Sequence, residues 1–220
     1  MLFNGCERHI DVATPYESKG KTSYDEYVLP VIKEELADCN IPKMLLVHCA
    51  GAHYPVKNAN PPWEKHFDNI VEPEVLAGLA EDIKDRVNRY DDAMLYEDKV
   101  LGEIVGLLKG RERPAMMLYI SDHGESPRAV NWRIFTELSV YEVPFVVWLS
   151  ESYRKQFPET VTRLEAARCK PFQSDELTYG IVELGQILNV GALDQSFLSP
   201  SFCGRKPRVV NKGRMVYNVE

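Results

Sequence analysis

The hydrophobic residues of this chain recur every three or four positions in four stretches, the spacing that places them on one side of a helix. The pattern predicts helices over residues 24–39, 73–109, 158–169 and 175–188. The second stretch is the longest, and its apolar residues form a single stripe that we expect to face a core. The stripe consists of Ala93, Tyr96, Val100, Leu101, Ile104, Val105 and Leu108.

Three short apolar runs lie between these helices, at residues 43–49, 115–121 and 143–150. Their length and nearly continuous apolar character are typical of strands buried on both faces. Strands that alternate with helices predict an α/β fold with a largely parallel sheet and helices on both faces. No internal repeat or low-complexity linker interrupts the sequence, so a single domain is the economical interpretation.

Composition and charge narrow the class of protein. The 220 residues are 45% hydrophobic and 27% charged, the ordinary mixture of a globular domain rather than of a disordered chain. The net charge is -7, which excludes nucleic-acid binding as the main task. No apolar stretch approaches the roughly 20 residues that a membrane span needs, and residues 1–20 lack a signal-peptide hydrophobic region. We therefore expect a soluble chain without a targeting segment.

Two further features leave alternatives open. The five cysteines are Cys6, Cys39, Cys49, Cys169 and Cys203. They are too scattered for a CxxC zinc pattern, and the sequence does not fix whether they form disulfides. The residues from 199 onward carry five basic side chains and one acidic side chain, a net charge of +4. This basic tail is either a solvated pair of strands or a face for anionic lipid or phosphate.

Chemically active side chains follow two of the predicted strands. His48 and His53 lie at the end of the first, and Asp122 and His123 directly follow the second. In open α/β sheets reactive groups collect beyond the carboxyl ends of strands, so we expect these four side chains in one cleft. A carboxylate beside neutral imidazoles is a partial ligand set for Zn²⁺. The alternative is an Asp–His pair that caps a strand end, and spacing alone does not separate the two.

Other candidates have structural alternatives as well. Taken alone, His53 is more often a loop histidine, and His48 is more often a core histidine within its strand. Cys49 would be a nucleophile if an imidazole activated it, but its place at the end of an apolar strand favours a buried, inert thiol. The acidic residues of the long predicted helix, among them Asp91 and Asp92, are expected on its solvated face.

Five sequence blocks suggest a family. In order, they are LLVHCAGAHYP, RYDDAMLYEDKVLGEIVGLL, MLYISDHGES, YEVPFVVWLS and KPFQSDELTYGIVELGQIL. This series, over roughly residues 24–217, resembles the carboxyl-terminal half of the sulfatase-like phosphoethanolamine transferases of the alkaline phosphatase superfamily. The resemblance implies the carboxyl-terminal part of an alkaline-phosphatase/sulfatase-like fold. It also implies zinc-dependent transfer of phosphoethanolamine from a phospholipid donor to a lipid or glycan acceptor, such as lipopolysaccharide, at the periplasmic face of the inner membrane.

The resemblance assigns roles to individual residues. By the match to the family's SDHG motif, Asp122 and His123 are implied to be zinc ligands. By the match to its H-x-x-G-S-H segment, His53 faces the transferred phosphate or a second zinc, and His48 is supporting structure. Arg128 and Arg133 follow the SDHG motif and offer guanidinium groups that can hold phosphate without replacing a metal ligand.

The chain departs from the family pattern in three ways. The family's threonine nucleophile and a strand with an acidic zinc ligand precede these blocks, and no segment of this chain matches either. No histidine follows His123, and the family's YDN stands here as Tyr90, Asp91 and Asp92. We therefore expect one sulfatase-like domain over residues 1–220 that lacks the amino-terminal part of its fold. The nucleophile and any membrane segment would lie upstream, and the incomplete fold would favour self-association.

Three functions fit these observations. The first is phosphoethanolamine transfer with the nucleophile outside this chain, so that the isolated chain binds zinc weakly and shows negligible turnover. The second keeps the superfamily but changes the substrate, so that the protein is a sulfatase or a phosphoglycerol transferase. The third is a catalytically inactive, truncated member that acts as a binding module.

Overall fold

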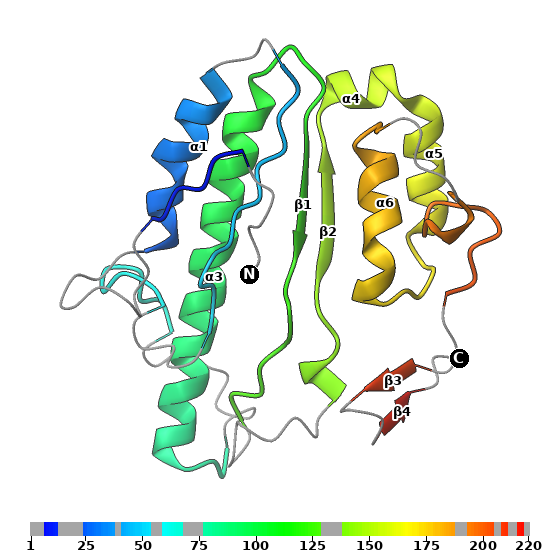
Figure 1. Cartoon of the computed structure of the whole chain (residues 1–220). Helices are drawn as coiled ribbons and strands as arrows, with labels where there is room; N and C mark the ends of the chain where they lie inside the picture. The colour runs from blue at the N-terminus through cyan, green and yellow to red at the C-terminus, as the bar shows by residue number, and fades with distance from the viewer. Residues whose placement is uncertain are drawn as a thin grey trace. The chain divides into compact units, whose positions relative to one another are not determined.

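The computed structural model describes residues 7–12, 24–37, 41–53, 59–67, 77–128, 138–187, 193–204, 208–210 and 215–217, and the structural statements below concern these residues (Figure 1). Contacts between Cα atoms divide the chain into two compact units, which are described separately. The first unit consists of Met1–Gly110 with Gly124–Ile134, and the second of Arg111–His123 with Phe135–Glu220.

Two helices form the frame of the first unit. A 3-10 turn, η1 (Asp25–Tyr27), leads into α1 (Val28–Ala37), and α1 packs along the long helix α3 (Glu81–Lys109) (Figure 1). α3 has two acidic side chains in its first turn and a basic one in its last, which suits the dipole of the helix. The helices predicted over 24–39 and 73–109 are confirmed, although α3 begins later than predicted.

The apolar stripe of α3 faces the core of the first unit, as its spacing predicts. Its buried members are Ala93, Tyr96, Val100, Ile104 and Leu108. Each large apolar side chain buried in this way contributes about 1.5–3 kcal/mol to folding. The hydroxyl of Tyr96 accepts a 3.1 Å hydrogen bond from the backbone N–H of Glu26, so the polar tip of this buried side chain is satisfied and ties η1 to α3.

The second unit contains a two-stranded sheet. β1 (Met116–Ile120) pairs antiparallel with β2 (Phe145–Leu149), and Met116 lies opposite Leu149 in the register (Figure 1). Beyond β2, the Ser150 hydroxyl accepts hydrogen bonds from the N–H groups of Ala115 at 2.9 Å and Tyr153 at 3.1 Å. This one side chain therefore caps the next helix and holds it at the start of β1.

Helices and a small hairpin complete the second unit. The helices are α4 (Glu151–Gln156), α5 (Pro158–Ala167) and α6 (Leu177–Leu184), and the 3-10 turns are η3 (Leu138–Val140), η4 (Ser174–Glu176) and η5 (Leu193–Gln195). The helices predicted over 158–169 and 175–188 are thus confirmed. β3 (Arg208–Val210) pairs antiparallel with β4 (Met215–Tyr217), which confirms a strand pair in the basic tail.

An aromatic cluster lies at the core of the second unit. Its buried members are Ala167, Leu184, Phe197 and Leu198, and the rings of Phe145 and Phe172 pack against them. The ring of Phe197 stacks on Phe172 with centroids 4.9 Å apart and meets Phe145 edge-on at 5.7 Å. A Cβ atom added at Gly180 would lie 1.9 Å from the Phe197 ring, so α6 packs this closely because position 180 is glycine.

Two predictions about the sheet are wrong. Residues 43–49 have no strand structure, and Met44 and Leu46 are 72% and 53% exposed rather than buried. An apolar run becomes a strand only where a neighbouring strand pairs with its backbone groups. β1 and β2 run antiparallel, whereas parallel neighbours were expected. A parallel pair is usually joined by a helix, and the described part of the β1–β2 connection contains only the short turn η3.

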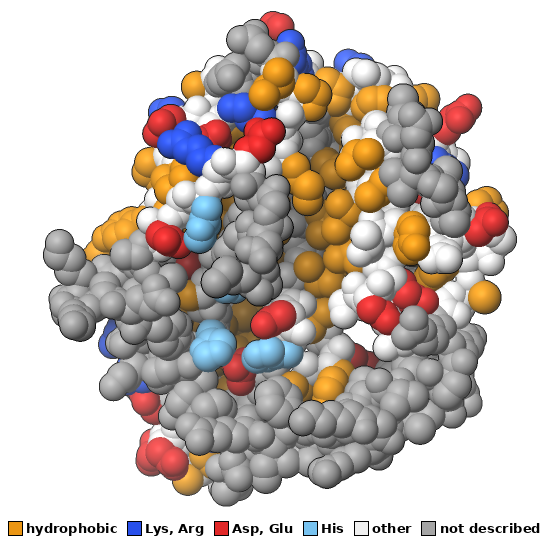
Figure 2. Space-filling model, viewed as in Figure 1, with side chains coloured by type: hydrophobic (Ala, Val, Ile, Leu, Met, Phe, Trp, Pro, Cys, Tyr) orange, Lys and Arg blue, Asp and Glu red, His pale blue; other side chains and the backbone are white. Residues whose placement is uncertain are grey.

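Large apolar side chains remain at the surface of the described chain. They include Ile41, Met44, Leu46 and Trp63, and hydrophobic side chains are visible at the surface in Figure 2. Exposed apolar patches of this kind favour association with other surfaces. Among the described helices, none combines the length and the apolar character required to cross a bilayer.

Candidate functional site

The Asp122–His123 pair lies in a turn directly after β1, in the second unit. The backbone N–H of His123 donates a 3.0 Å hydrogen bond to Asp122 Oδ1, and the Ser121 hydroxyl donates to the carbonyl oxygen of His123 at 2.7 Å. The side chain of Asp122 is 87% exposed and that of His123 is 33% exposed, so both reach solvent. Local hydrogen bonds therefore fix the backbone of the turn, while the carboxylate and the imidazole both remain accessible to solvent.

The geometry of this pair suits a metal ion. Nε2 of His123 lies 4.0 Å from Oδ1 of Asp122. Two ligands of one tetrahedral zinc ion are separated by about 3.5 Å, so a small side-chain rotation would bring both onto one ion. A carboxylate oxygen and an imidazole nitrogen are also the donor types that zinc accepts.

The loop between His48 and His53 lies in the first unit and is held by Asp25. The Asp25 carboxylate accepts hydrogen bonds from the N–H groups of Ala50 at 2.9 Å and Gly51 at 2.8 Å. Gly51 has a φ of +53°, a left-handed conformation that glycine adopts without strain. Both histidines are exposed, so the interpretation of His48 as a core histidine is wrong, because the segment that carries it is not a buried strand.

The segment after the Asp122–His123 turn belongs to the first unit and packs on α3. Nε of Arg86 donates a 2.6 Å hydrogen bond to the carbonyl oxygen of Pro127. Burial raises the pKa of Asp91 on the same helix, and the neighbouring guanidinium of Arg128 partly offsets this effect. Arg128 therefore lies beside an acidic side chain of α3, whereas Arg133 lies outside the described residues.

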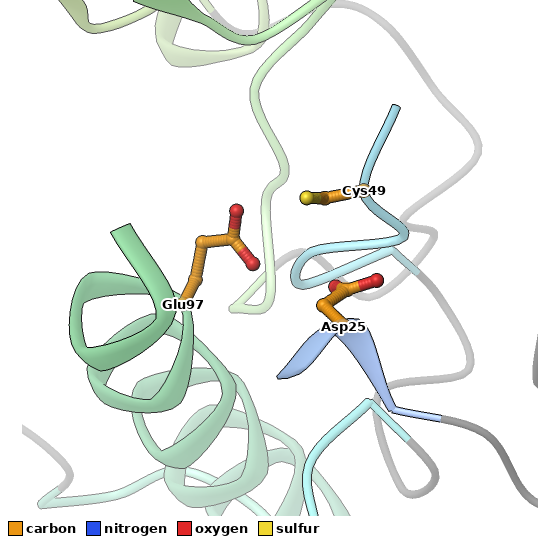
Figure 3. A group of neighbouring side chains, drawn as sticks. All are labelled: Asp25, Cys49 and Glu97. Carbon is orange, nitrogen blue, oxygen red and sulfur yellow. The ribbon is translucent and has the colours of Figure 1, made fainter. Parts of the chain in front are cut away.

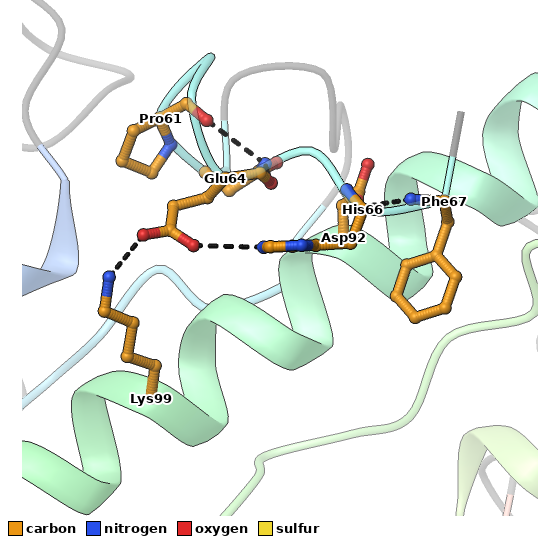
Figure 4. A network of polar contacts seen from close by, with 7 residues as sticks. Pro61, Glu64, His66, Phe67, Asp92 and Lys99 are labelled. Atoms are coloured by element: carbon orange, nitrogen blue, oxygen red, sulfur yellow. Dashed lines mark hydrogen bonds and ion pairs between the residues drawn. The ribbon is translucent and has the colours of Figure 1, made fainter.

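Asp92 anchors a further loop to α3, which the sequence did not predict. Its side chain is 3% exposed, and Oδ1 accepts hydrogen bonds from the backbone N–H groups of His66 at 2.6 Å and Phe67 at 3.1 Å (Figure 4). The expectation that Asp92 belongs to a solvated face is thus wrong. The Asp in the third position of the Tyr90–Asp92 motif is a structural acceptor that pairs with two backbone donors.

Glu64 extends this network at the surface of the same loop. Its carboxylate pairs with Lys99 of α3 and with Nε2 of His66 at 3.2 Å (Figure 4). The hydrogen bond from Lys99, and then the one from His66, hold the pKa of Glu64 below its ordinary value. The 59–67 loop is therefore attached to α3 through two carboxylates, the buried one of Asp92 and the partly buried one of Glu64.

A second group of potential ligands lies inside the first unit. Asp25 of η1, Cys49 and Glu97 of α3 bring their ligating atoms within 4.8 Å of one another (Figure 3). Burial raises the pKa of Cys49, and the negative charges of Glu97 and Asp25 raise it further. Cys49 is thus a protonated thiol without a bound cation, which supports the interpretation of an unreactive cysteine over that of a nucleophile.

Comparison with known proteins decides the family. The family model described as Sulfatase matches residues 4–187. This chain belongs to the sulfatase family. The resemblance inferred from the five sequence blocks is thereby confirmed.

The curated proteins similar to this chain include several phosphoethanolamine transferases. The chain is 31% identical to phosphoethanolamine transferase EptC of Escherichia coli O18:K1:H7 over 142 residues, which is 61% of this chain and 24% of that protein. It is 28% identical to phosphoethanolamine transferase EptA of Helicobacter pylori over 148 residues, which is 60% of this chain and 27% of that protein. The chain thus matches about a quarter of the length of these relatives.

Solved structures show the same fold. The C-terminal periplasmic domain of E. coli EptC, in complex with zinc, superposes with a TM-score of 0.76 at 24% identity and covers 91% of this chain and 58% of that one. The corresponding domain of EptC from Campylobacter jejuni has a TM-score of 0.65 at 21% identity, over 83% of this chain and 60% of that one. The sulfatase-like fold of the chain is therefore established.

The candidate residues of this sulfatase-family chain fall into distinct groups. Asp122 and His123 are neighbours in the second unit. His48 and His53 flank the loop in the first unit that Asp25 holds by hydrogen bonds. Arg128 belongs to the same unit but to a different segment. That the Asp122–His123 pair shares a cleft with His53 stays a prediction.

Proposed function

We propose that this chain is the carboxyl-terminal portion of a zinc-dependent phosphoethanolamine transferase that acts on a lipid or glycan of the cell envelope. The observation that carries the proposal is the solvent-accessible Asp122–His123 turn after β1, in a chain whose curated relatives include phosphoethanolamine transferases. A phospholipid would be the donor, and the acceptor would be a component such as lipopolysaccharide. The protein would work at the periplasmic face of the inner membrane.

Asp122 and His123 would hold the zinc ion. Their donor types and their 4.0 Å separation support this assignment. The zinc complex of the E. coli EptC domain supports the choice of metal. When bound, zinc would supply a Lewis acid that lowers the pKa of a coordinated hydroxyl and neutralises negative charge.

Histidine and arginine side chains would bind the transferred phosphate. His53 is exposed at the end of a loop whose backbone Asp25 fixes, so it can donate a hydrogen bond to a phosphate oxygen. His48 would support this loop. Arg128 and, by its place in the sequence, Arg133 would offer guanidinium groups, which pair well with phosphate. Phosphoryl transfer depends mainly on positioning and charge stabilisation, so these groups would account for much of what this chain contributes.

The nucleophile would come from a segment that this chain does not contain. The family resemblance implies a threonine in this role, and the chain corresponds to about a quarter of the curated relatives. Residues 1–220 would then be part of a single sulfatase-like domain, completed by residues upstream. A membrane-spanning segment would likewise belong to that upstream part.

Sulfate-ester hydrolysis is the second candidate, because the matching family model is that of the sulfatases. The two functions differ in the group that is transferred, so matched model esters of sulfate and phosphoethanolamine separate them. A third outcome, a member that binds ligands without turnover, would show activity on neither ester.

The test uses the protein produced with the coding sequence upstream of Met1. We expect transfer of a labelled phosphoethanolamine group from phosphatidylethanolamine to an envelope lipid, and negligible transfer by residues 1–220 alone. Asp122→Ala and His123→Ala should each lower kcat by more than about 100-fold, as expected for loss of a group that stabilises developing charge. Asp98→Ala, on the exposed face of α3, is the matched control and should leave transfer unchanged. Undiminished transfer by both site variants would contradict the proposal.

A further inference from the structure

Three side chains that can ligate a metal converge from three separate segments of the first unit. Asp25 comes from η1, Cys49 from the loop between His48 and His53, and Glu97 from α3 (Figure 3). Their ligating atoms lie within 4.8 Å of one another. Ligands of a tetrahedral zinc ion lie about 3.5 Å apart, so modest rotation of these side chains would complete a common centre.

The Glu97 carboxylate is deeply buried, and one of its oxygens is unsatisfied within the described part of the chain. The side chain is 3% exposed, and its Oε2 has no hydrogen-bond partner among the described residues. Figure 3 shows the carboxylate of Glu97 directed toward Cys49 and Asp25. Burial of a carboxylate oxygen without a partner costs several kcal/mol unless a proton or a cation compensates it.

The described residues offer the cluster no ion pair with a basic side chain. No lysine or arginine in the described part of the chain forms an ion pair with Asp25 or Glu97. Asp25 uses its two oxygens to accept the N–H groups of Ala50 and Gly51, and each oxygen retains a lone pair. Two carboxylates and a thiol in this space therefore form a site that attracts a cation.

We propose that Asp25, Cys49 and Glu97 bind a divalent transition-metal ion, with zinc as the expected metal. A sulfur ligand selects zinc over magnesium and calcium, which prefer oxygen ligands throughout. On binding, the Cys49 thiol loses its proton to solvent and the thiolate sulfur forms the bond to the metal. Three protein ligands leave one tetrahedral position for water.

The site uses residues other than Asp122 and His123 and does not depend on the proposed function. Its position suggests what it does. Asp25 already holds the turn at Ala50 and Gly51, and a metal shared with Cys49 and Glu97 would tie this turn to α3. We expect it to fix the backbone between His48 and His53 rather than to take part in chemistry.

The metal-free alternative is a pair of carboxyl groups that share a proton. Protonation of Glu97 would satisfy its oxygen through a hydrogen bond with Asp25, and burial favours this form by raising the pKa of Glu97. The two arrangements differ in their need for Cys49. A shared proton needs no sulfur, whereas a metal centre of this composition does.

Cobalt provides a spectroscopic test, because Co²⁺ bound to a thiolate absorbs strongly in the near ultraviolet. We expect the wild-type chain to show this band with one equivalent of Co²⁺, and Cys49→Ser to abolish it. A variant that keeps Cys49 but has serine in place of the other four cysteines should keep the band. The replaced residues are Cys6, Cys39, Cys169 and Cys203. Asp122→Ala should also keep it. A band that survives Cys49→Ser, or no band in the wild type, would overturn the proposal.

Zinc affinity provides a second measurement, by competition with a chromophoric chelator. Glu97→Gln keeps the shape of the side chain but removes a direct ligand. Loss of a residue that only supports a ligand weakens metal binding by up to about 100-fold, so this variant should weaken zinc binding by at least that factor. Circular dichroism must show that the variant is folded. In an Asp122→Ala background, which removes the other proposed zinc site, zinc should also raise the Tm, and adding Cys49→Ser should abolish this rise, because a ligand that binds only the folded state stabilises it. Equal zinc-induced shifts in the two proteins would contradict the site.

Discussion

The carboxylate of Asp25 accepts a 2.8 Å hydrogen bond from the backbone N–H of Gly51. This contact joins η1 to the turn between His48 and His53, and a second bond from Ala50 to the same carboxylate strengthens it. The left-handed conformation of Gly51 places the two N–H groups so that one carboxylate can accept both. The loop proposed to bind phosphate is therefore held by an aspartate from a segment distant in sequence.

Asp25→Asn should destabilise the first unit. The amide keeps one acceptor oxygen but presents an N–H₂ group to a backbone donor, so one partly buried N–H loses its partner. Such a loss costs about 1–3 kcal/mol, and urea unfolding measures it. Asp11→Asn is the control, because the Asp11 side chain is 90% exposed, and it should change the free energy of unfolding by less than about 0.5 kcal/mol. Equal stability of the two variants would mean that the Asp25 contacts do not support the fold.

Asp92→Asn and Asp92→Ala should differ in their effects. Both backbone donors, His66 and Phe67, bond to the same oxygen, Oδ1, and asparagine can keep an oxygen there. Alanine removes the acceptor and leaves two N–H groups unpaired. We expect the alanine variant to lose about 2 kcal/mol more in the free energy of unfolding than the asparagine variant. If the asparagine variant were as unstable as the alanine variant, the negative charge rather than the acceptor would hold the loop.

The metal-free protein should become less stable as the pH rises. Burial, followed by the negative charge of Asp25, raises the pKa of Glu97 from 4.5 to about 7. Between these values the folded state binds more protons than the unfolded state. The contribution of Glu97 to stability is therefore complete below about pH 4.5 and is lost as the pH rises through about 7.

Urea unfolding in the presence of a chelator measures this dependence. We expect the wild-type midpoint to fall between about pH 5 and about pH 8, and Glu97→Gln to remove that fall. The groups that face Glu97 are Asp25 and Cys49, and neither changes in this variant. Asp98→Asn, on the exposed side of α3, should behave like the wild type. A fall of the same size in Glu97→Gln would assign the effect to other groups.

Gly180→Ala should disrupt the aromatic core of the second unit. The added methyl group would overlap the ring of Phe197, which is buried and stacked on Phe172 and so cannot move freely. Overpacking of this kind costs about 1–3 kcal/mol. Gly102→Ala in α3 is the matched control, because open space surrounds that position, and it should stabilise the protein by about 0.5–1 kcal/mol. Thermal unfolding of the two variants should therefore shift in opposite directions.

Helical periodicity predicted α1, α3, α5 and α6, because the apolar positions that define each helix lie within one continuous stretch of sequence. It missed α4, which is short and depends on the Ser150 cap rather than on a stripe of apolar residues. The runs that became β1 and β2 were also predicted, but not their direction, because direction depends on the connection between them. Residues 43–49 are as apolar as these two runs but form no strand. A strand also needs a neighbouring strand that pairs with its backbone, and the run itself does not reveal one.

The candidate site was predictable only where its residues adjoin in the sequence. Asp122 and His123 are consecutive and follow an apolar strand, so a local motif identifies them. Asp25, Cys49 and Glu97 come from three distant segments, and no local pattern connects them. Glu97 also follows Tyr96 in a helix whose other acidic residues are mostly exposed, so its burial had no signal in the sequence.

The central claim is that the turn after β1 binds zinc through Asp122 and His123. Side-chain ¹⁵N NMR of the five histidines during zinc titration tests it most directly, in a Cys49→Ser background that removes the second proposed site. We predict that the ring resonances of His123 shift with zinc, and that Asp122→Ala weakens this response by at least about 10-fold. Unchanged His123 resonances at saturating zinc, or an equal response in Asp122→Ala, would contradict the account.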